Sequence, residues 1–279
     1  MIGQTVHWET KSGKKLSGKV TGGEKGKRWR IEGGGKKYYV PKEDVKKGVF
    51  KKPKNKKKIA ILISSRLTSY DKHYKNIMEN LVQGNDVDFY AGISTEPINE
   101  RLLDGFLKLY KPIAWAISDK PLFDIDFKKE KEKMPADSAP PQNTVFQARN
   151  RDKSRELLMS KNIEYDWIIS TRADVYYKNK LDYSELDPSV VNIPNGANYG
   201  GIQDKIAIAK KPLMLRYLNM YDYLPEHITI KRKSLHAEQT LNNYLKKFKI
   251  PVKRMTLVHQ LFPKVSLGDK LKVAETGQK

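Results

Sequence analysis

The chain contains no cysteine and no long hydrophobic run. The absence of thiols excludes disulfides, thiolate chemistry and cysteine-ligated zinc. No segment approaches the roughly 18 to 20 apolar residues that a transmembrane helix needs, and the first residues lack the apolar stretch of a signal peptide. We therefore expect a protein without a membrane span, located in the cytoplasm.

Acidic residues are scarce in the first fifth of the chain. Residues 1–58 contain 19 Lys and Arg against 5 Asp and Glu, a formal net charge of +14. The remaining 221 residues contain 35 basic and 27 acidic residues, a net charge of +8. Because the excess positive charge is concentrated at one end, we expect that end to bind a polyanion and the rest of the chain to carry any chemistry.

Residues 1–48 have the pattern of a small all-β barrel. Glycine and lysine turns separate four short strand-like pieces at regular spacing, and these pieces are Gln4–Glu9, Leu16–Thr21, Arg28–Glu32 and Lys37–Val40. The runs Val6–Trp8, Gly18–Val20 and Tyr38–Pro41 resemble small Tudor-like barrels. The resemblance implies a separate basic module at this end of the chain.

Aromatic residues in this module are candidates for nucleic-acid binding. Trp8, Trp29 and Tyr38 stand among lysines, so their rings can stack on bases while the cations meet phosphates. The alternative is that these aromatics form the core of the barrel, because a barrel this small has little else to bury.

Residues 49–58 form a lysine-rich linker. This stretch has several like charges in a row and no hydrophobic periodicity, which is typical of a solvated segment. Lys56 and Lys57 lie at its end, and we include them among the candidate nucleic-acid contacts.

From residue 59 onward, strand and helix patterns alternate. Continuous apolar runs predict buried strands, and helical periodicity follows most of them. The predicted strands are 59–63, 87–91, 113–117, 167–169, 205–209 and 252–258, and the predicted helices are 71–83, 98–110, 146–162, 212–223 and 237–248. We therefore predict that residues 59–279 form one α/β domain with a largely parallel sheet.

Two segments interrupt this alternation. Residues 118–143 contain several prolines and a charged cluster, so we expect a long loop that is either a flap over a substrate or a surface excursion. Residues 192–201 are rich in asparagine and glycine and predict a second loop.

The stretch 165–177 places two opposite charges directly after a buried strand. Its apolar residues 167–169 are followed by Arg172 and Asp174. If the strand continues to position 174, these two side chains share one face. Open α/β sheets bind ligands at the carboxyl ends of their strands, so we expect this stretch to form the floor of a nucleotide-sugar site.

Five motifs occur in an order that resembles the GT-A-like glycosyltransferases of viral and bacterial genomes. They are Lys58–Arg66, Val87–Tyr90, Tyr165–Val175, Gly200–Ala209 and His236–Leu241. The resemblance implies a GT-A-like, Rossmann-like fold and a nucleotide-diphosphate sugar as donor. If the protein is viral, its cytoplasmic location is that of a host cell.

The resemblance also implies a donor site. In that family an Arg-x-Asp at a strand end stands where other GT-A enzymes carry Asp-x-Asp, so Asp174 matches the second aspartate and Arg172 departs from the first. The expected donor-binding residues are Ser64, Arg66, Asp88, Arg172 and Asp174. The alternative for Arg172 and Asp174 is a pair that only ties the strand end to its neighbour.

The developing charge on the leaving diphosphate must be neutralised by a divalent cation, by arginine and lysine, or by both. We expect Mn²⁺ or Mg²⁺ as a cofactor with Asp174 and His259 as its protein ligands, although Arg172 leaves the dependence on metal open. The alternative for His259 is a surface or capping residue at a strand end.

The acceptor hydroxyl must lose a proton as it attacks the anomeric carbon, and a carboxylate is the usual base. By resemblance we expect Glu238 to be this base and Asp204 to bind the acceptor or the sugar. The alternative for Glu238 is a carboxylate that stabilises the helix dipole from the first turn.

Together these features predict a glycosyltransferase that moves a hexosyl or pentosyl group to an acceptor hydroxyl, with modified DNA as one candidate acceptor. The alternative is a nucleic-acid-binding protein that keeps a GT-A-like scaffold without catalysis, since a fold does not determine a function.

Deleting residues 1–58 tests the role of the basic module. We expect the deletion to weaken binding to duplex DNA and to reduce the salt dependence of binding, because most of the positive charge is removed. Fluorescence anisotropy at several salt concentrations measures both quantities. Unchanged DNA affinity in the deletion variant would contradict this role.

Overall fold

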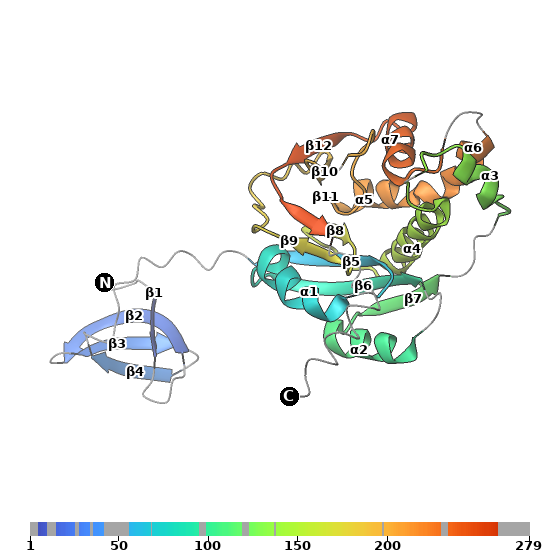
Figure 1. The fold of residues 1–279 in the computed structure, drawn as a ribbon. Coiled ribbons are helices and arrows are strands. Elements are labelled where there is room, and N and C mark those ends of the chain that lie inside the picture. The colour runs from blue at the N-terminus through green and yellow to red at the C-terminus, as the bar shows by residue number, and fades with distance from the viewer. Residues whose placement is uncertain are drawn as a thin grey trace, which may run out of the picture. The chain divides into compact units, whose positions relative to one another are not determined.

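The computed structural model describes residues 5–9, 15–25, 28–33, 36–41, 56–67, 69–94, 99–118, 123–136, 138–196, 198–229 and 234–261. The chain divides into two compact units, residues 1–55 and residues 56–279. Both are drawn in Figure 1. The predicted linker 49–58 contains this division, and its residues 49–55 lie outside the described part of the chain.

The first unit contains a four-stranded antiparallel sheet. Its strands pair in sequence order, and they are β1 (Thr5–Glu9), β2 (Lys15–Lys25), β3 (Arg28–Gly33) and β4 (Lys36–Pro41). Each strand overlaps one of the four strand-like pieces of the sequence. Closure of this sheet into a barrel stays a prediction.

The second unit is built on a mixed, mostly parallel sheet of seven strands. In spatial order they are β12 (Val252–Met255), β10 (Val191–Pro194), β11 (Ala207–Ala209), β8 (Trp167–Thr171), β5 (Lys58–Ser65), β6 (Asp86–Ser94) and β7 (Ala114–Ser118). Strand β11 runs antiparallel to both of its neighbours, whereas the pairs along β8-β5-β6-β7 are parallel. The predicted α/β class with a mostly parallel sheet is confirmed.

Strand β5 explains why this sheet is buried on both faces. Its apolar residues alternate between two hydrophobic cores, because successive side chains of a strand point to opposite faces. Ala60 and Leu62 belong to one core, and Ile59, Ile61 and Ile63 belong to the other. Because both faces of β5 are buried, its sequence is an uninterrupted apolar run and does not alternate with polar residues.

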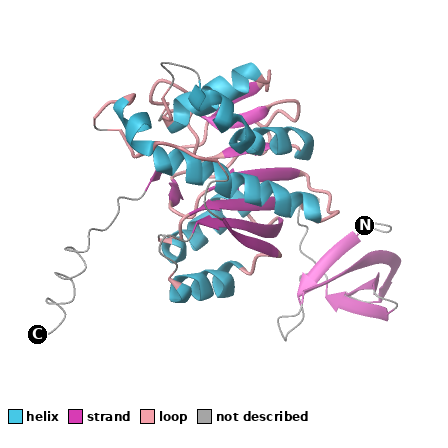
Figure 2. Ribbon diagram, turned by 90° about the vertical axis from the view of Figure 1, so that its right-hand side faces the viewer, coloured by secondary structure: helices cyan, strands magenta, loops and turns pink. Residues whose placement is uncertain are grey.

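Helices cover the two faces of the sheet (Figures 1 and 2). One face packs against α4 (Pro141–Ser160), α5 (Lys211–Leu218), the 3₁₀ turn η2 (Asn219–Tyr223) and α7 (Ala237–Lys247). The other packs against α1 (Tyr70–Ile77), the π-helical turn η1 (Met78–Val82) and α2 (Glu100–Tyr110). Two short helices are α3 (Phe127–Glu132) and α6 (Leu224–Thr229). No helix in the described ranges is both long and apolar enough to cross a membrane.

The predicted loop 192–201 is wrong at its start, because residues 192–194 belong to strand β10. All four residues of this strand are buried. The Asn192 amide donates to the carbonyl oxygens of Asp187 at 2.9 Å and Ile208 at 3.2 Å, and its Oδ1 accepts from the Asp187 backbone at 3.0 Å. An asparagine that is typical of loops is therefore satisfied inside the sheet.

Three further boundaries differ from prediction. The expected loop 118–143 contains α3 and the first turn of α4. Strand β8 ends at Thr171 and does not continue to Asp174, because the chain turns before β9 (Val175–Tyr177). The predicted strand 252–258 ends at Met255, and the later strand β13 (His259–Leu261) pairs with β9 in a separate two-stranded sheet. Both strands are only three residues long, which leaves too short a pattern for periodicity to detect.

Candidate functional site

The carboxyl ends of β5 and β8 define the candidate site. From β5 the chain continues to β6 and β7 on one side, and it returns to β8 on the other side of β5. Neighbouring strands whose connections leave in opposite directions create a crevice at their carboxyl ends. The two loops that follow are tied together here, because the Ala173 backbone N–H donates to Ser65 Oγ at 3.0 Å.

Arg172 and Asp174 form a bidentate ion pair at this edge. Arg172 Nε donates to Asp174 Oδ1 at 2.8 Å, and Nη2 donates to Oδ2 at 2.6 Å. Burial lowers the pKa of Arg172, but the hydrogen bonds and charge of Asp174 outweigh burial, and the charges of Asp204 and Glu238 add to the rise. The two carboxylates from later elements therefore lie within electrostatic reach of the Arg-x-Asp motif.

Lys205 bridges the two carboxylates that the sequence pointed to as catalytic. Its Nζ lies 3.1 Å from Glu238 Oε1 and 3.6 Å from Asp204 Oδ1. All three side chains are at most 10% exposed. Burial alone would raise the pKa of Asp204, but Arg151, Lys205 and Arg172 hold it below its usual value. Asp204 is therefore a fixed anion at neutral pH.

Arg151, like Lys205, is a member of this site that the sequence did not reveal. It projects from α4, donates to the backbone carbonyl of Asp204, and lies 3.6 Å from the Asp204 carboxylate. Its guanidinium also lies 5.8 Å from the centre of the Tyr217 ring. In the sequence it stands among the charged residues 149–156, most of which have the composition of a solvated helix face. The missed signal is that this helix is followed directly by a buried strand and must pack on the sheet.

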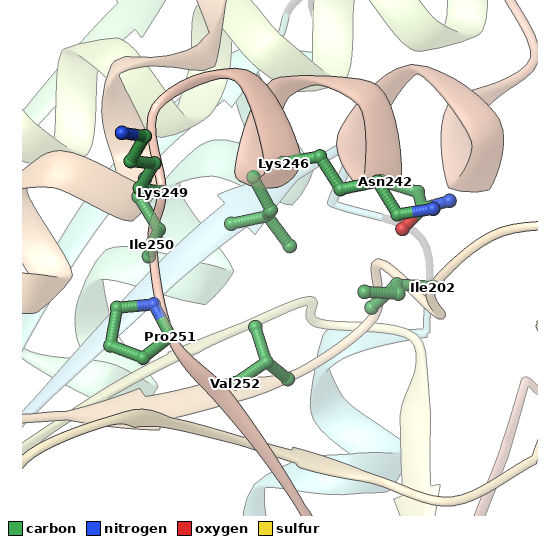
Figure 3. A pocket seen from close by; sticks show the side chains of 8 residues that line it. Ile202, Asn242, Lys246, Lys249, Ile250, Pro251 and Val252 are labelled. Atoms are coloured by element: carbon green, nitrogen blue, oxygen red, sulfur yellow. The ribbon is translucent and has the colours of Figure 1, made fainter.

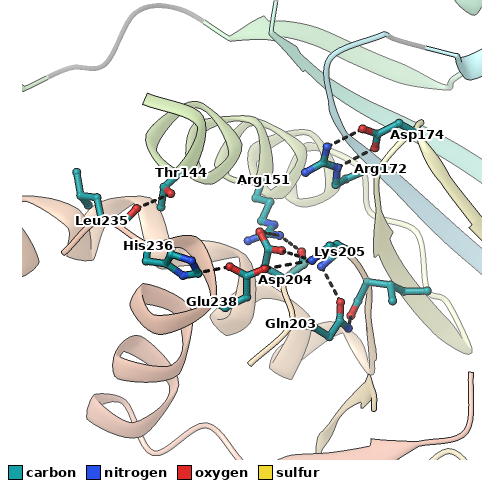
Figure 4. A network of polar contacts seen from close by, with 11 residues as sticks. Thr144, Arg151, Arg172, Asp174, Gln203, Asp204, Lys205, Leu235, His236 and Glu238 are labelled. Carbon is teal, nitrogen blue, oxygen red and sulfur yellow. Dashed lines mark hydrogen bonds and ion pairs between the residues drawn. The ribbon is translucent and has the colours of Figure 1, made fainter. Parts of the chain in front are cut away.

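These six residues, Arg151, Arg172, Asp174, Asp204, Lys205 and Glu238, are called the charged cluster below (Figure 4). They come from four elements that are far apart in sequence: helix α4, the turn after β8, the segment before β11, and helix α7. Three cations and three anions make the charged cluster formally neutral.

A glycine loop brings two of these elements together. Gly200 has φ 78°, which favours glycine, and a Cβ at Gly201 would collide with the carbonyl oxygen of Glu238. The Ile202 N–H donates to that same carbonyl at 3.1 Å. The close approach seats Asp204 and Lys205 beside the first turn of α7.

The three remaining residues that were predicted to bind the donor, Ser64, Arg66 and Asp88, differ in their burial and in their place in the sheet. Ser64 is buried at the end of β5 and shares a hydrogen bond of 2.8 Å with Ser154 Oγ. Arg66 is exposed just beyond it and donates to Asn143 Oδ1 at 3.4 Å. Asp88 does not join the site: it pairs with Ala60 near the amino ends of the strands and accepts a hydrogen bond from Tyr165 at 2.9 Å. Of these three residues, only Arg66 is exposed at the candidate site.

His259 lies on β13 and within electrostatic reach of Asp204 and Lys205. Burial lowers its pKa, so the imidazole is neutral at pH 7. The described residues nevertheless contain no group of three or more histidine and acidic side chains that could hold a metal ion. Both oxygens of Asp174 accept from Arg172. The arrangement of these residues does not fit a protein-held divalent cation.

The predicted nucleic-acid contacts fall mainly on the first unit. Trp8, Trp29 and Tyr38 belong to β1, β3 and β4, and their side chains lie outside the described part of the structure. Lys56 is exposed and lies 3.6 Å from Asp86, and Lys57 Nζ lies 6.0 Å from the centre of the Tyr183 ring. The geometry of this candidate interface stays a prediction.

A shallow groove of about 340 Å³ lies between α7 and the start of β12 (Figure 3). Its apolar residues include Ile202, Leu245, Ile250 and Val252, and its polar residues include Lys246 and Lys249. None of its lining residues belongs to the charged cluster. The groove is therefore separate from the candidate chemistry.

A family model described as a domain of unknown function, DUF7796, matches residues 154–263. This match spans every member of the charged cluster except Arg151, and it also spans His259. No curated protein matches the chain.

Replacing Arg151 by methionine tests how the charged cluster is held. We expect Arg151→Met to lower the free energy of unfolding at pH 7 by about 3–5 kcal/mol, because Asp204 loses a partner while remaining buried. Asp204 also makes the free energy of unfolding depend on pH, because folding lowers its pKa. Its contribution to stability is present above its unfolded pKa of about 3.9 and is lost as the pH falls through its lower pKa in the folded protein. Urea unfolding measures the change.

The double variant Arg151→Met/Asp204→Asn is the matched control. Removing the unpaired charge as well should recover part of the loss, because the two residues are coupled. Equal stability of the single variant and the wild type would contradict the importance of this pair.

Proposed function

We propose that the protein is a glycosyltransferase that moves a sugar from a nucleotide-diphosphate donor to an acceptor hydroxyl. The observation that carries the proposal is the charged cluster itself, which lies at the carboxyl edge of a mostly parallel sheet. Buried ion pairs contribute little net stability, so a cluster of six charged residues is costly as a purely structural device. Clusters of this kind are characteristic of functional sites.

Each part of the charged cluster matches a demand of sugar transfer. Carboxylates accept hydrogen bonds from sugar hydroxyls, and Asp204 and Glu238 supply two of them. A departing diphosphate needs fixed cations, and arginine offers two parallel donors to phosphate. Arg172 is held ready for this role by Asp174, and Arg66 stands at the adjoining strand end without a carboxylate partner among the described residues.

We further propose that the acceptor is a polyanion such as modified DNA. The support is the net charge of +14 within residues 1–58, which favours sequence-independent contacts to phosphates. The same charge favours a second candidate function, a nucleic-acid-binding protein whose GT-A-like scaffold is inactive. Turnover of a nucleotide sugar distinguishes the two.

The direct test is a panel of nucleotide sugars with release of the nucleotide as the readout. We expect the full-length protein to release nucleotide from one class of donor, and we expect Arg172→Ala and Asp204→Asn each to lower the rate by about 10²-fold or more. Asn242→Ala, in the separate groove on α7, is the matched control and should retain the wild-type rate. The proposed glycosyltransferase activity would be refuted if no donor bound or turned over and if Asp174→Ala behaved like the wild type.

A second prediction concerns the arginine side chains that, in this proposal, neutralise the charge of the leaving diphosphate. We expect turnover to persist in EDTA, and we expect Arg66→Ala to weaken binding of the nucleoside diphosphate about tenfold or more, because a charge-assisted hydrogen bond is lost. Calorimetric titration measures the affinity, and Lys108→Ala on the exposed side of α2 is the control. A loss of turnover in EDTA that Mn²⁺ restores would contradict it.

A further inference from the structure

His236 is the N-cap residue of α7, but its side chain does not cap the helix. Side chains at the N-cap commonly accept a hydrogen bond from the first helical N–H groups. The His236 side chain makes no such bond. Its Nδ1 lies instead 3.3 Å from Glu238 Oε2, two residues further along the chain (Figure 4).

The backbone that carries His236 is fixed from three sides. The Leu235 carbonyl accepts a hydrogen bond from Thr144 Oγ1 at 2.6 Å. The Ser234 carbonyl lies 3.1 Å from His227 Nε2 and 3.3 Å from Thr240 Oγ1. Side chains from α4, α6 and α7 thus hold this short segment. A functional group mounted on such a support keeps its geometry when a ligand binds.

Glu238 is poorly arranged to take a proton from an acceptor. Lys205 Nζ donates to its Oε1 at 3.1 Å, and His236 Nδ1 lies 3.3 Å from its Oε2, so a nitrogen lies beside each oxygen. The Glu238 side chain is 10% exposed, against 19% for His236. A general base must reach the proton that it removes. The imidazole is the more accessible of the two groups.

We propose that His236 is the general base of the transfer and that Glu238 is its positioning residue, an inference that rests on the proposed function. Nδ1 lies 3.3 Å from Glu238 Oε2, and a proton placed on Nδ1 beside this carboxylate leaves the free lone pair on Nε2, as in other carboxylate-histidine pairs. In the part of the chain that the structure describes, Glu238 is the charged group in contact with the imidazole, and Lys205 lies beyond that carboxylate.

The step balances without a further reactant. The acceptor oxygen forms a bond to the anomeric carbon as the bond from that carbon to the diphosphate oxygen breaks. The electron pair leaves with the diphosphate, and the hydroxyl proton passes to Nε2 of His236. Glu238 stabilises the imidazolium that forms, and the proton then leaves to solvent.

The role of His236 as general base is tested by the kinetics of His236→Gln in the full-length protein. The donor is the one that the panel of nucleotide sugars identifies. We expect kcat to fall about 10²- to 10⁴-fold while affinity for the nucleoside diphosphate is unchanged. The wild-type rate should rise with pH, as is usual for catalysis by a general base, and this rise should disappear in His236→Gln. Added imidazole should restore part of the rate of His236→Gly, which a structural role would not explain.

Glu238→Gln separates the two roles. We expect it to lower kcat but to keep the rise of the rate with pH, because His236 remains. A wild-type rate in His236→Gln, together with loss of the pH-dependent rise in Glu238→Gln, would overturn the assignment and return the base to Glu238. Thermal unfolding of each variant shows whether it is folded.

The tautomer of His236 gives a readout that needs no turnover. Nitrogen NMR of the full-length protein above pH 8 should show the Nδ1–H tautomer, and Glu238→Gln should change that signal. A protonated Nε2 in the wild-type protein would overturn the pairing. If no donor turns over but the Nδ1–H tautomer is present, the proposed function fails while the His236–Glu238 pairing stands.

Discussion

The structure of the second unit depends on the requirement that buried charges be paired. Asp204 is enclosed by Arg151 and Lys205, and Lys205 also meets Glu238. Removing any one of these partners would leave an unpaired charge in a region that is largely shielded from water, where the cost of desolvation exceeds the free energy that the remaining contact contributes. The elements that carry these residues are therefore fixed relative to one another by electrostatics as well as by apolar packing.

The sheet determines where this constraint is placed. Because β6 and β8 lie on opposite sides of β5, the connections that follow the central strands lead to opposite sides of β5, which is the arrangement at which open α/β sheets bind ligands. The antiparallel strand β11 then starts at the same edge, which delivers Asp204 and Lys205 to the turn that carries Arg172. The close contact of Gly201 with the α7 backbone completes the assembly by bringing Glu238 alongside.

The same geometry bears on how the proposed chemistry is assigned. Both oxygens of Asp174 accept from Arg172, so under the proposed function the charge of a diphosphate would be met by arginine and not by a cation held between carboxylates. Glu238 accepts a hydrogen bond from Lys205 and lies 3.3 Å from His236, and our proposal therefore gives the proton to the imidazole. In both cases the proposal has a carboxylate that resembles a reactive group hold a neighbouring side chain in place.

The sequence by itself determined the alternation of strand and helix and the burial of β5, because periodicity is a local signal. It also pointed to Arg172, Asp174, Asp204 and Glu238, which the structure brings near one edge of the sheet. It did not point to Arg151, Lys205, His236 or strand β10, and the structure places Asp88, an expected donor residue, away from the charged cluster. Those outcomes depend on which elements pack together. Arg151 resembles a solvated residue until α4 lies on the sheet, and Asn192 resembles a loop residue until β11 supplies its partner. Tertiary contact alone decides whether a polar side chain faces water or another charge.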